Sequence, residues 1–439
     1  MKKYLIVLWL FVIAGTGQAQ SVYTNLFVEN SLGESVSRVD VTEGKIWNNL
    51  FTTGNVPNQI KVRGDSLYIL NSISSTLQIV NLNTQQEVAT IDLGANKNPW
   101  NFTFCKSSGL IFVTNLMANS VSVVDVTKGS VVDSIAVGKA PEGILAFGKK
   151  VYVTNTAFDA TTFSYGQGTV SIIDAASRSV VDSILTPVNP QNLAVDASGR
   201  LHVVCTGNFA TVSGSVLVVD LSTKTVVDTV AVGGTPSSIT MAPNGVAYLG
   251  SGGWVTSGNV LAYDASTLSV LHSADNPIRT GTGAMDVLAD DAGHVFVAAF
   301  NEDKVDVIDT KADSVVSSYE VGDGPQSLAL WKTTVSRVAE KENSEQVPAR
   351  FALKQNYPNP IKAKANAVTQ FSFRIPGTEN VTLKIYNVLG QVVATLVDGK
   401  LSAGSHRIQA NLGYLSPGLY FAQLRTAQGV RTRKLVVQP

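Results

Sequence analysis

Residues 140–155 read APEGILAFGKKVYVTN, and after an insertion residues 168–186 read GTVSIIDAASRSVVDSILT. Four short runs in this stretch are rich in β-branched and aromatic residues and are separated by turn residues. The second and third runs alternate apolar and polar residues, which is the period of a β-strand. The stretch therefore predicts four successive strands: Gly143–Phe147, Val151–Thr154, Thr169–Ile173 and Val180–Ile184.

The same pattern recurs along most of the chain. In each copy an Asp or Asn closes the third run, and these residues are Asp40, Asn81, Asp125, Asp174, Asp220, Asp264 and Asp309. Their spacing of 41 to 49 residues is typical of a four-stranded β-propeller blade. Six complete units begin at Pro57, Pro99, Pro141, Pro190, Pro236 and Ala284.

A seventh blade is predicted from the two ends of the repeat region. The run Pro325–Trp331 has the character of an inner strand but lacks the three strands that should follow it. Three unmatched runs stand near the N-terminus, at Leu26–Asn30, Ser35–Asp40 and Trp47–Thr53. We expect these four runs to form one sheet, which would close the ring and remove a free sheet edge.

The second strand carries a recognisable motif. It reads VYVTN at Val151–Asn155 and IFVTN at Ile111–Asn115, with looser copies that end at Asn30 and Asn71. Over roughly residues 25–331 the chain resembles the YVTN-repeat, or YncE-like, seven-bladed propellers. We expect the side-chain amide of this Asn to form hydrogen bonds with the backbone of the loop that follows it. We expect the Asp at the end of the third strand to accept backbone N–H groups in the turn to the fourth strand. Later blades depart from the motif, with Cys205, Gly250 and Ala299 in place of the Asn.

The N-terminal residues 1–19 predict a secretory signal peptide. Lys2 and Lys3 precede an apolar stretch, and small residues stand before the expected cleavage point. No other stretch approaches the apolar length of a transmembrane segment. Cys105 and Cys205 lie in non-adjacent blades, so we expect two buried thiols and no disulfide.

Charge divides the rest of the chain into two domains. Residues 20–332 hold 17 Lys and Arg against 28 Asp and Glu, a net charge of −11, whereas residues 351–439 hold 11 against 2, a net charge of +9. The acidic balance of the propeller argues against nucleic acid as a partner. We assign residues 20–331 to the propeller, residues 332–350 to a polar linker and residues 351–439 to a C-terminal domain.

The C-terminal domain has its own pattern of strands of about 6–8 residues with Gly and Pro turns, which predicts a small immunoglobulin-like β-sandwich. It resembles the type A sorting domain of the type IX (Por) secretion system. The matching segments are Asn356–Pro360, Leu383–Gly390, Gly418–Tyr420 and Lys434–Val437, with a departure at Ile361–Ala363. The resemblance implies the secretion apparatus as a partner, export across the outer membrane, removal of the domain, and attachment to a surface glycolipid or release.

Three consecutive blades break the repeat in the same place. The loops between the second and third strands are enlarged at Thr156–Gly168, Thr206–Gly214 and Ser251–Gly258. They should emerge on the face where the inner strands begin, and they carry the aromatic residues Phe158, Phe163, Tyr165, Phe209 and Trp254. Aromatic loops on a rigid scaffold are typical of binding sites, although these side chains could instead pack on one another as a lid.

The first residues of the inner strands should line the rim of a central channel, and most of them carry amide or hydroxyl groups. The candidate ligand-binding residues at the rim are Trp100, Glu142, Gln191, Asn192 and Asp286, joined by Tyr165, Phe209 and Trp254 from the loops. This combination suits a neutral polar ligand such as a glycan or a peptide. The alternatives are a channel that holds only ordered water, or a metal ion between Glu142 and Asp286.

Catalytic patterns are missing from the sequence. It contains no HExxH, CxxC or phosphate-binding glycine loop, and His202, His272 and His294 share no rim position. We therefore predict an all-β protein, a seven-bladed β-propeller followed by a small β-sandwich, that is monomeric, secreted and displayed on the cell surface as a binding scaffold, with no catalytic residue, metal or cofactor. The alternative is a lactonase-like propeller hydrolase or lyase acting at the central channel.

Overall fold

The computed structural model describes residues 20–252, 258–336, 352–353, 356, 358–362, 368–375, 377–387, 391–427 and 429–438. The chain divides into two compact units, Met1–Arg337 and Val338–Pro439. The predicted signal peptide lies outside the described residues. In the described part of the chain, no helix combines the length and the hydropathy that crossing a bilayer requires.

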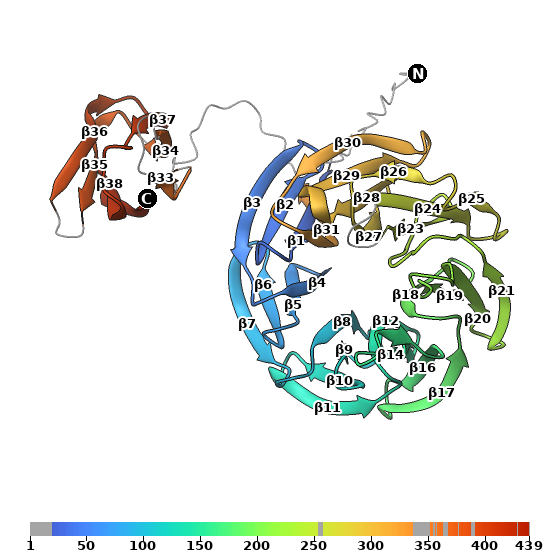
Figure 1. Ribbon diagram of the computed structural model, residues 1–439. Helices are drawn as coiled ribbons and strands as arrows, with labels where there is room; N and C mark the ends of the chain where they lie inside the picture. The colour runs from blue at the N-terminus through green and yellow to red at the C-terminus, as the bar shows by residue number, and fades with distance from the viewer. Residues whose placement is uncertain are drawn as a thin grey trace, which may run out of the picture. The chain divides into compact units, whose positions relative to one another are not determined.

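Seven sheets surround a central axis in the first unit (Figure 1). Each is a blade, and blades 1 to 6 are built from consecutive strands. Blade 1 consists of β4 (Pro57–Arg63), β5 (Ser66–Asn71), β6 (Thr76–Asn81) and β7 (Gln86–Asp92). Blade 2 consists of β8 (Pro99–Phe104), β9 (Ile111–Asn115), β10 (Ser120–Asp125) and β11 (Ser130–Ala136). Blade 3 consists of β12 (Pro141–Phe147), β13 (Lys150–Asn155), β16 (Thr169–Asp174) and β17 (Ser179–Leu185).

The second half of the ring repeats this arrangement with small departures. Blade 4 consists of β18 (Pro190–Val195), β19 (Arg200–Cys205), β20 (Ser215–Asp220) and β21 (Thr225–Val230). Blade 5 consists of β22 (Thr240–Met241), β23 (Val246–Ser251), β24 (Gly258–Asp264) and β25 (Val270–His272), with β26 (Ile278–Thr280) also paired to β24. Blade 6 consists of β27 (Ala284–Ala289), β28 (His294–Ala299), β29 (Lys304–Asp309) and β30 (Ser314–Glu320), with the short 3-10 turn η1 at Phe300–Glu302.

Blade 7 joins the two ends of the propeller sequence. Its strands are β31 (Pro325–Ser336), β1 (Gln20–Asn30), β2 (Ser35–Asp40) and β3 (Lys45–Thr52), from the inside outward. The antiparallel register of β1 and β31 runs from Gln20 opposite Ser336 to Asn30 opposite Pro325. The predicted pairing of the two ends is therefore observed.

Both closing strands are longer than the sequence predicts. Strand β1 begins at Gln20 instead of Leu26, and β31 continues through Lys332–Ser336, which the sequence analysis assigns to the linker. This segment is polar and lacks strand periodicity. It is extended because it pairs with the start of β1, so a tertiary contact overrides local preference.

The hydrophobic core lies between the blades. Val151 and Val153 of blade 3 pack against Phe112 of blade 2, whereas the intervening Tyr152 packs against blade 4. Alternate residues of one strand thus face opposite neighbours, which is the consequence of the strand period. Seven such clusters connect successive blades, and the cluster that closes the ring joins Phe27 of blade 7 to Ile69 of blade 1. A single blade has no core of its own.

The turn after each third strand is built as predicted. Asp174 Oδ1 accepts backbone N–H groups from Ala176 at 3.1 Å and Ser177 at 2.9 Å. The same pair of bonds is made by Asp40, Asn81, Asp125, Asp220, Asp264 and Asp309. These side chains are occupied in holding turns, and they explain the recurrence of the residue without any catalytic role.

The predicted partner of the motif Asn is wrong. Asn155 Nδ2 donates to Thr169 Oγ1 at 3.0 Å and to Ser171 Oγ at 2.9 Å, hydroxyls of the third strand, and not to the loop backbone. Asn30 and Asn115 make the equivalent pairs of bonds. The amide therefore locks the second strand to the third.

A glycine ahead of the inner strand makes room for this amide. A Cβ atom added to Gly138 would lie 2.6 Å from Asn155 Cγ, closer than any side chain tolerates. In blade 5 the residue in the place of the Asn is Ser251, which bridges to Pro236, and not the predicted Gly250. The enlarged loop that follows Ser251 hides this register in the sequence.

The outermost strands are bulged. In blade 3, Ile172 lies opposite Asp182 while the next residue, Ile173, lies opposite Val180, so that Val181 is left over. The corresponding residues of the other consecutive blades are Val88, Val132, Val227, Leu271 and Val316. A bulge interrupts the row of backbone groups that an edge strand would otherwise present.

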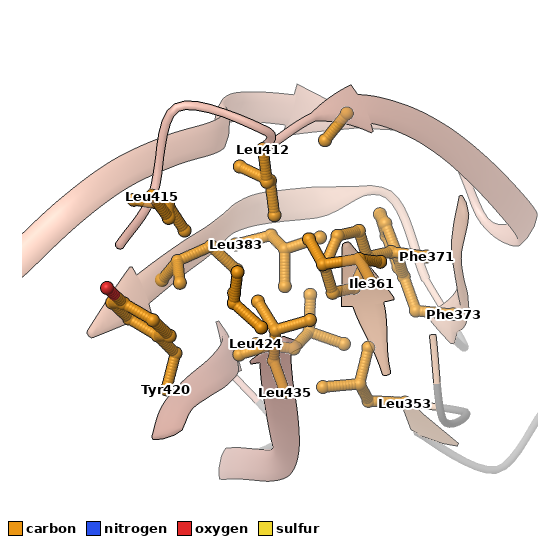
Figure 2. Close-up of a cluster of buried hydrophobic side chains, with 14 of the residues drawn as sticks. Leu353, Ile361, Phe371, Phe373, Leu383, Leu412, Leu415, Tyr420, Leu424 and Leu435 are labelled. Carbon is orange, nitrogen blue, oxygen red and sulfur yellow. The ribbon is translucent and has the colours of Figure 1, made fainter. Parts of the chain in front are cut away.

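The C-terminal unit contains two sheets. One has the order β32 (Ala352–Leu353), β34 (Val368–Ile375) and β37 (Gly404–Asn411); the other has the order β33 (Ile361–Lys362), β39 (Gly429–Gln438), β38 (Gly418–Thr426), β35 (Glu379–Asn387) and β36 (Val392–Leu401). Side chains from both sheets form one core, as Figure 2 shows for Phe371 and Phe373 of β34 and Leu383 and Leu424 of the second sheet. This is the predicted small β-sandwich.

The Asn-Pro segment of this unit holds strand β39. Asn359 Nδ2 donates to the carbonyl of Lys434 at 3.1 Å, and Asn359 Oδ1 accepts from the N–H of Val436 at 2.8 Å. Ile361, part of the departure noted in the sequence, is buried and pairs in parallel with Val437. Ile361 therefore contributes to the core of this unit.

Closure of the ring can be tested by removing its N-terminal strands. Deletion of residues 20–54 takes away the partner of β31 and the side chains of β1 and β2 in the clusters that link blade 7 to blades 6 and 1, among them Leu26, Phe27 and Val36. We expect loss of the cooperative melting transition, monitored by circular dichroism. Deletion of residues 351–439 is the control and should leave the propeller transition unchanged. A propeller that melts normally without residues 20–54 would contradict the closure.

Candidate functional site

The starts of the inner strands meet at one rim. A narrow cavity of about 90 Å³ is lined by residues of all seven blades: Asn58, Gln59, Trp100, Asn101, Glu142, Gln191, Asn192, Ser237, Ser238, Met285, Asp286 and Gln326. These are the positions expected from the sequence. In blade 5 the rim residues precede the short strand β22 and are held by the bridge from Pro236 to Ser251.

One half of the rim is cross-linked by its own amides. Gln326 Nε2 donates to Asn58 Oδ1 at 2.5 Å, and Asn58 Nδ2 donates to the carbonyl of Trp100 at 2.5 Å. Gln59 Nε2 donates to Ser327 Oγ at 2.8 Å. The amides of blades 7 and 1 are therefore engaged with their neighbours.

The other half of the rim opens into a larger cavity of about 770 Å³. The rim contributes Trp100, Glu142, Gln191, Ser237 and Met285, and the remaining lining residues are Leu116, Phe158, Phe163, Tyr165, Thr206, Asn208, Phe209 and Thr235. The enlarged loops of blades 3 and 4 thus stand over the rim. The cavity falls in the size range of small-molecule sites.

The loop of blade 3 is an ordered hairpin. Its strands β14 (Phe158–Asp159) and β15 (Ser164–Tyr165) pair with each other, and Asp159 Oδ1 accepts two backbone N–H groups in the turn between them. Lys139 Nζ lies 2.6 Å from Asp159 Oδ2 and ties the hairpin to the link before β12. The hairpin presents its aromatic residues from a fixed support.

The aromatic side chains form a continuous row. The ring centroids of Phe158 and Phe163 are 6.2 Å apart, those of Phe158 and Tyr165 are 5.2 Å apart, and those of Tyr165 and Phe209 are 6.1 Å apart. These contacts between rings partly agree with the alternative that the aromatic side chains pack on one another as a lid. However, Phe163 is 80% exposed and Phe209 is 55% exposed, so the row leaves much aromatic surface uncovered.

Two of these aromatic residues have strained backbones. Phe163 has φ of 50° and Phe209 has φ of 59°, in the left-handed region that bulky residues avoid. Such a conformation costs about 1–2 kcal/mol. The same conformation occurs at turn residues elsewhere in the propeller, including Val56 and Leu268, so it reflects the tight geometry of the two loops.

Glu142 is the acidic residue of the larger cavity. Glu142 is 8% exposed, and the loss of hydration on burial raises the pKa of its carboxyl group to about 8. Burial raises the pKa of Tyr165, and the nearby Glu142 carboxylate raises it further. The following residue, Gly143, permits a close approach of blade 4, because a Cβ there would lie 2.5 Å from the carbonyl oxygen of Gln191.

Asp286 and Asn192 lie at the rim but do not line the larger cavity. Asp286 Oδ1 accepts from the N–H of Val287 and Oδ2 from the N–H of Leu328, both at 2.9 Å. Burial raises its pKa to about 6 in spite of these bonds. Asn192 Oδ1 accepts from the N–H of Leu193 at 2.8 Å. Both side chains thus hold the inner strands in place.

The predicted site residues therefore fall into three groups. Trp100, Glu142, Gln191, Tyr165 and Phe209 line the larger cavity together. Asn192 and Asp286 belong to the adjoining rim. Trp254 lies outside the described residues.

The sequence analysis missed Glu29 near the rim. Glu29 in β1 is fully buried, and neither of its carboxylate oxygens has a hydrogen-bond partner among the described residues. Burial, and next the charge of Asp286, hold its pKa well above the usual range. The sequence did contain a signal for this residue. Glu29 stands at the motif position that is Thr in blades 2 and 3 and Leu in blade 1, and the two-residue period of the strand predicts that this position is buried.

The histidines of the propeller are engaged with aspartates far from the cavity. His202, which is fully buried, lies 3.1 Å from Asp196 and 2.7 Å from the Tyr263 hydroxyl. His272 and His294 pair with Asp313 and Asp290. Within the described ranges, no three Asp, Glu, His or Cys side chains gather in a way that could hold a metal ion. Cys105 and Cys205 are buried and unpaired with each other.

Comparison with known proteins identifies the C-terminal unit. Residues 355–438 match the family model of the secretion system C-terminal sorting domain. The C-terminal unit is a type IX secretion sorting domain. This sorting domain directs export to the cell surface or secretion, and it implies contact with the secretion apparatus.

The propeller is similar to solved structures only in fold. Hydrazine synthase from Kuenenia stuttgartiensis aligns with a TM-score of 0.52 at 17% identity, over 64% of this chain and 96% of that chain. Apo AztD from Citrobacter koseri aligns with a TM-score of 0.45 at 11% identity, over 73% of this chain and 100% of that chain, which is too weak to support an argument. No curated protein matches the sequence. The chemistry of the site must therefore be argued from its own residues.

Replacement of Glu142 tests the state of its carboxyl group. Its pKa of about 8 in the folded protein lies above the ordinary value of 4.5, so ionisation of Glu142 opposes folding. This penalty is absent below about pH 4.5 and grows as the pH rises towards 8. Glu142→Gln cannot ionise. We expect its Tm to match that of the parent protein near pH 4.5 and to exceed it by a few degrees above about pH 8.

The control for this comparison is Glu320→Gln, which removes the same charge from an exposed position. Its Tm should follow that of the parent protein at every pH. A Glu142→Gln protein no more stable than the parent at alkaline pH would show that the carboxyl group is hydrated.

Proposed function

We propose that the protein is a secreted, surface-displayed binding protein whose propeller, of the YVTN-repeat or YncE-like type, holds a glycan or peptide ligand in the larger cavity. The observation that carries this proposal is the row of aromatic side chains over the rim, which includes the exposed Phe163 and Phe209. Aromatic faces stack on sugar rings and on peptide side chains, and they occupy the dominant positions in most binding sites.

Different blades of the propeller have different roles. Blades 7 and 1 hold the ring together through the amides of the rim. Blades 2 to 6 supply the larger cavity, where Gln191, Ser237 and Asn208 offer polar groups to orient a ligand. A preformed cavity on a closed scaffold binds with little cost in ordering.

A propeller hydrolase or lyase is the second candidate. The specific observation in its favour is Glu142, whose raised pKa is the property of a general acid at neutral pH. The carboxyl group of Asp286, the other acid of the rim cavity, is occupied by backbone N–H groups. Conversion of a lactone or glycan substrate by the parent protein but not by Glu142→Gln would favour this candidate over a binding function.

The binding proposal is tested by truncating aromatic residues. A glycan and peptide array probed with the full mature chain identifies a ligand, and its affinity is then measured for variants. We expect Tyr165→Ala and Phe209→Ala each to weaken binding several-fold, because a contacting aromatic side chain contributes about 1 kcal/mol or more. The Tm of Phe209→Ala should be nearly unchanged, since the side chain is 55% exposed.

Phe147→Ala is the matched control. Phe147 is 44% exposed and ends strand β12, at the opposite end from the rim residue Glu142. Its loss should not alter the affinity. If Tyr165→Ala and Phe209→Ala lower the Tm and leave the affinity intact, the aromatic row is a lid and the ligand binds elsewhere.

The fate of the sorting domain is also part of the proposal: the domain is removed after export, and the propeller is then attached to a surface glycolipid or released. A fusion of residues 351–439 to an unrelated periplasmic reporter should appear outside a host that has the type IX apparatus, shortened by the mass of the domain. The same fusion in a host whose apparatus is deleted is the control. A reporter that reaches the surface at full length would contradict removal.

A further inference from the structure

The larger cavity has an unusual balance of side chains. Five aromatic residues line it, and its ionisable carboxyl group is that of Glu142. None of the described lining residues is Lys, Arg or His. An acid in an apolar cavity without a basic partner is electrostatically unsatisfied when it ionises.

The carboxyl group and the aromatic row meet at Tyr165. Glu142 and Tyr165 line the same cavity, and the charge of Glu142 raises the pKa of the Tyr165 hydroxyl. The ring of Tyr165 lies 5.2 Å from Phe158 and 6.1 Å from Phe209, measured between centroids. Trp100 lines both the rim cavity and the larger cavity, as Glu142 does.

Aromatic faces and carboxylates both bind cations. The face of an aromatic ring carries negative charge density and attracts cations, and an ammonium group is the natural partner of a buried carboxylate. We propose that the larger cavity binds an alkylammonium group, seated among Trp100, Tyr165 and Phe209 and paired with Glu142. This inference rests on the proposed binding function and specifies a cationic group that the ligand carries. A neutral ligand would leave the buried carboxyl group without a charged partner.

The net charge of the propeller favours the same class of ligand. Residues 20–332 carry 28 acidic against 17 basic residues. Such an excess raises the local concentration of small cations and speeds their association.

The proposed pairing makes binding depend on pH. The strands on either side of Glu142 present Trp100 and Asn101 from β8 and Gln191 and Asn192 from β18, all neutral, and the loop above presents Tyr165. Asp286, across the rim, is held by backbone N–H groups. Between pH 6 and pH 8.5, Glu142 is the group lining the larger cavity that titrates: with a pKa of about 8 it is mostly neutral in the free protein at pH 6 and mostly ionised at pH 8.5. Asp286, whose pKa is about 6, also gains charge over this range, but it does not line the larger cavity.

The probe is choline, whose quaternary ammonium group does not titrate. Its binding to the full mature chain is measured by isothermal titration calorimetry at pH 6 and pH 8.5. We expect an affinity at least about tenfold higher at pH 8.5, because the ionised fraction of Glu142 sets the fraction of competent protein. The neutral isostere 3,3-dimethylbutan-1-ol should bind more weakly than choline and without this pH dependence.

Two variants separate the role of Glu142 from general electrostatics. Glu142→Gln should abolish both the preference for choline over the isostere and the pH dependence. Glu320→Gln removes one exposed acidic charge and should change neither. The melting curve of Glu142→Gln confirms that the variant is folded.

A second probe distinguishes the possible sources of the alkylammonium group. N-acetyl-lysinamide binding as tightly as choline indicates a lysine side chain, and choline binding alone indicates a quaternary ammonium compound. Equal binding of choline and its isostere, or an unchanged preference in Glu142→Gln, overturns the inference. If neither cation binds but an array ligand does, and that binding requires Tyr165 and Phe209, the inference fails while the proposed function stands. If no probe and no array ligand binds, both fail.

Discussion

The antiparallel pairing of β1 with β31 is the contact on which the propeller depends. Each hydrophobic cluster lies between two blades, so every blade needs a neighbour on both sides. Without this pairing, blades 6 and 1 would each expose one apolar face. The pairing also sets the rim, because the inner strands converge on one axis only when the ring is complete.

Within the closed ring, the repeat and its interruptions have different roles. The repeated residues stabilise each blade: Asn155 links two strands, and Asp174 holds a turn. The candidate site lies where the repeat is interrupted, in the hairpin at Phe158–Tyr165 and the loop that contains Phe209. The rim follows the same division. Its amides are hydrogen-bonded to one another's blades in blades 7 and 1, whereas rim residues of blades 2 to 6 line the larger cavity.

Sequence periodicity could predict the order of the blades, the strand that closes the ring, and the rim residues such as Trp100 and Gln191. These depend on local pattern and on the count of repeats. The partner of Asn155 could not be predicted, because the loop backbone follows it directly in sequence whereas the hydroxyls that it contacts, on Thr169 and Ser171, lie beyond that loop in the third strand. The length of β31 could not be predicted either, since Lys332–Ser336 is extended only through its contact with β1.

The electrostatics of the site were the least predictable feature. Glu142 and Asp286 occupy similar places in the pattern, yet Asp286 is bound by backbone N–H groups of its own and the next blade, whereas Glu142 faces aromatic residues brought in by distant loops. Only the assembled ring shows this difference. The strained conformations of Phe163 and Phe209 likewise arise from loop geometry that no periodic pattern encodes.

The bulges in the outer strands acquire a further meaning once the protein is exported. Where the propeller is held at a cell surface, its outer strands are the sheet edges that neighbouring molecules can meet. A straight strand at that circumference could add to the sheet of the next molecule and join the ring to a growing array. The leftover residue in the outer strands of blades 1 to 6, Val181 in blade 3 for instance, interrupts the row of backbone groups that a second strand would have to match. The bulges therefore disfavour edge-to-edge association between rings.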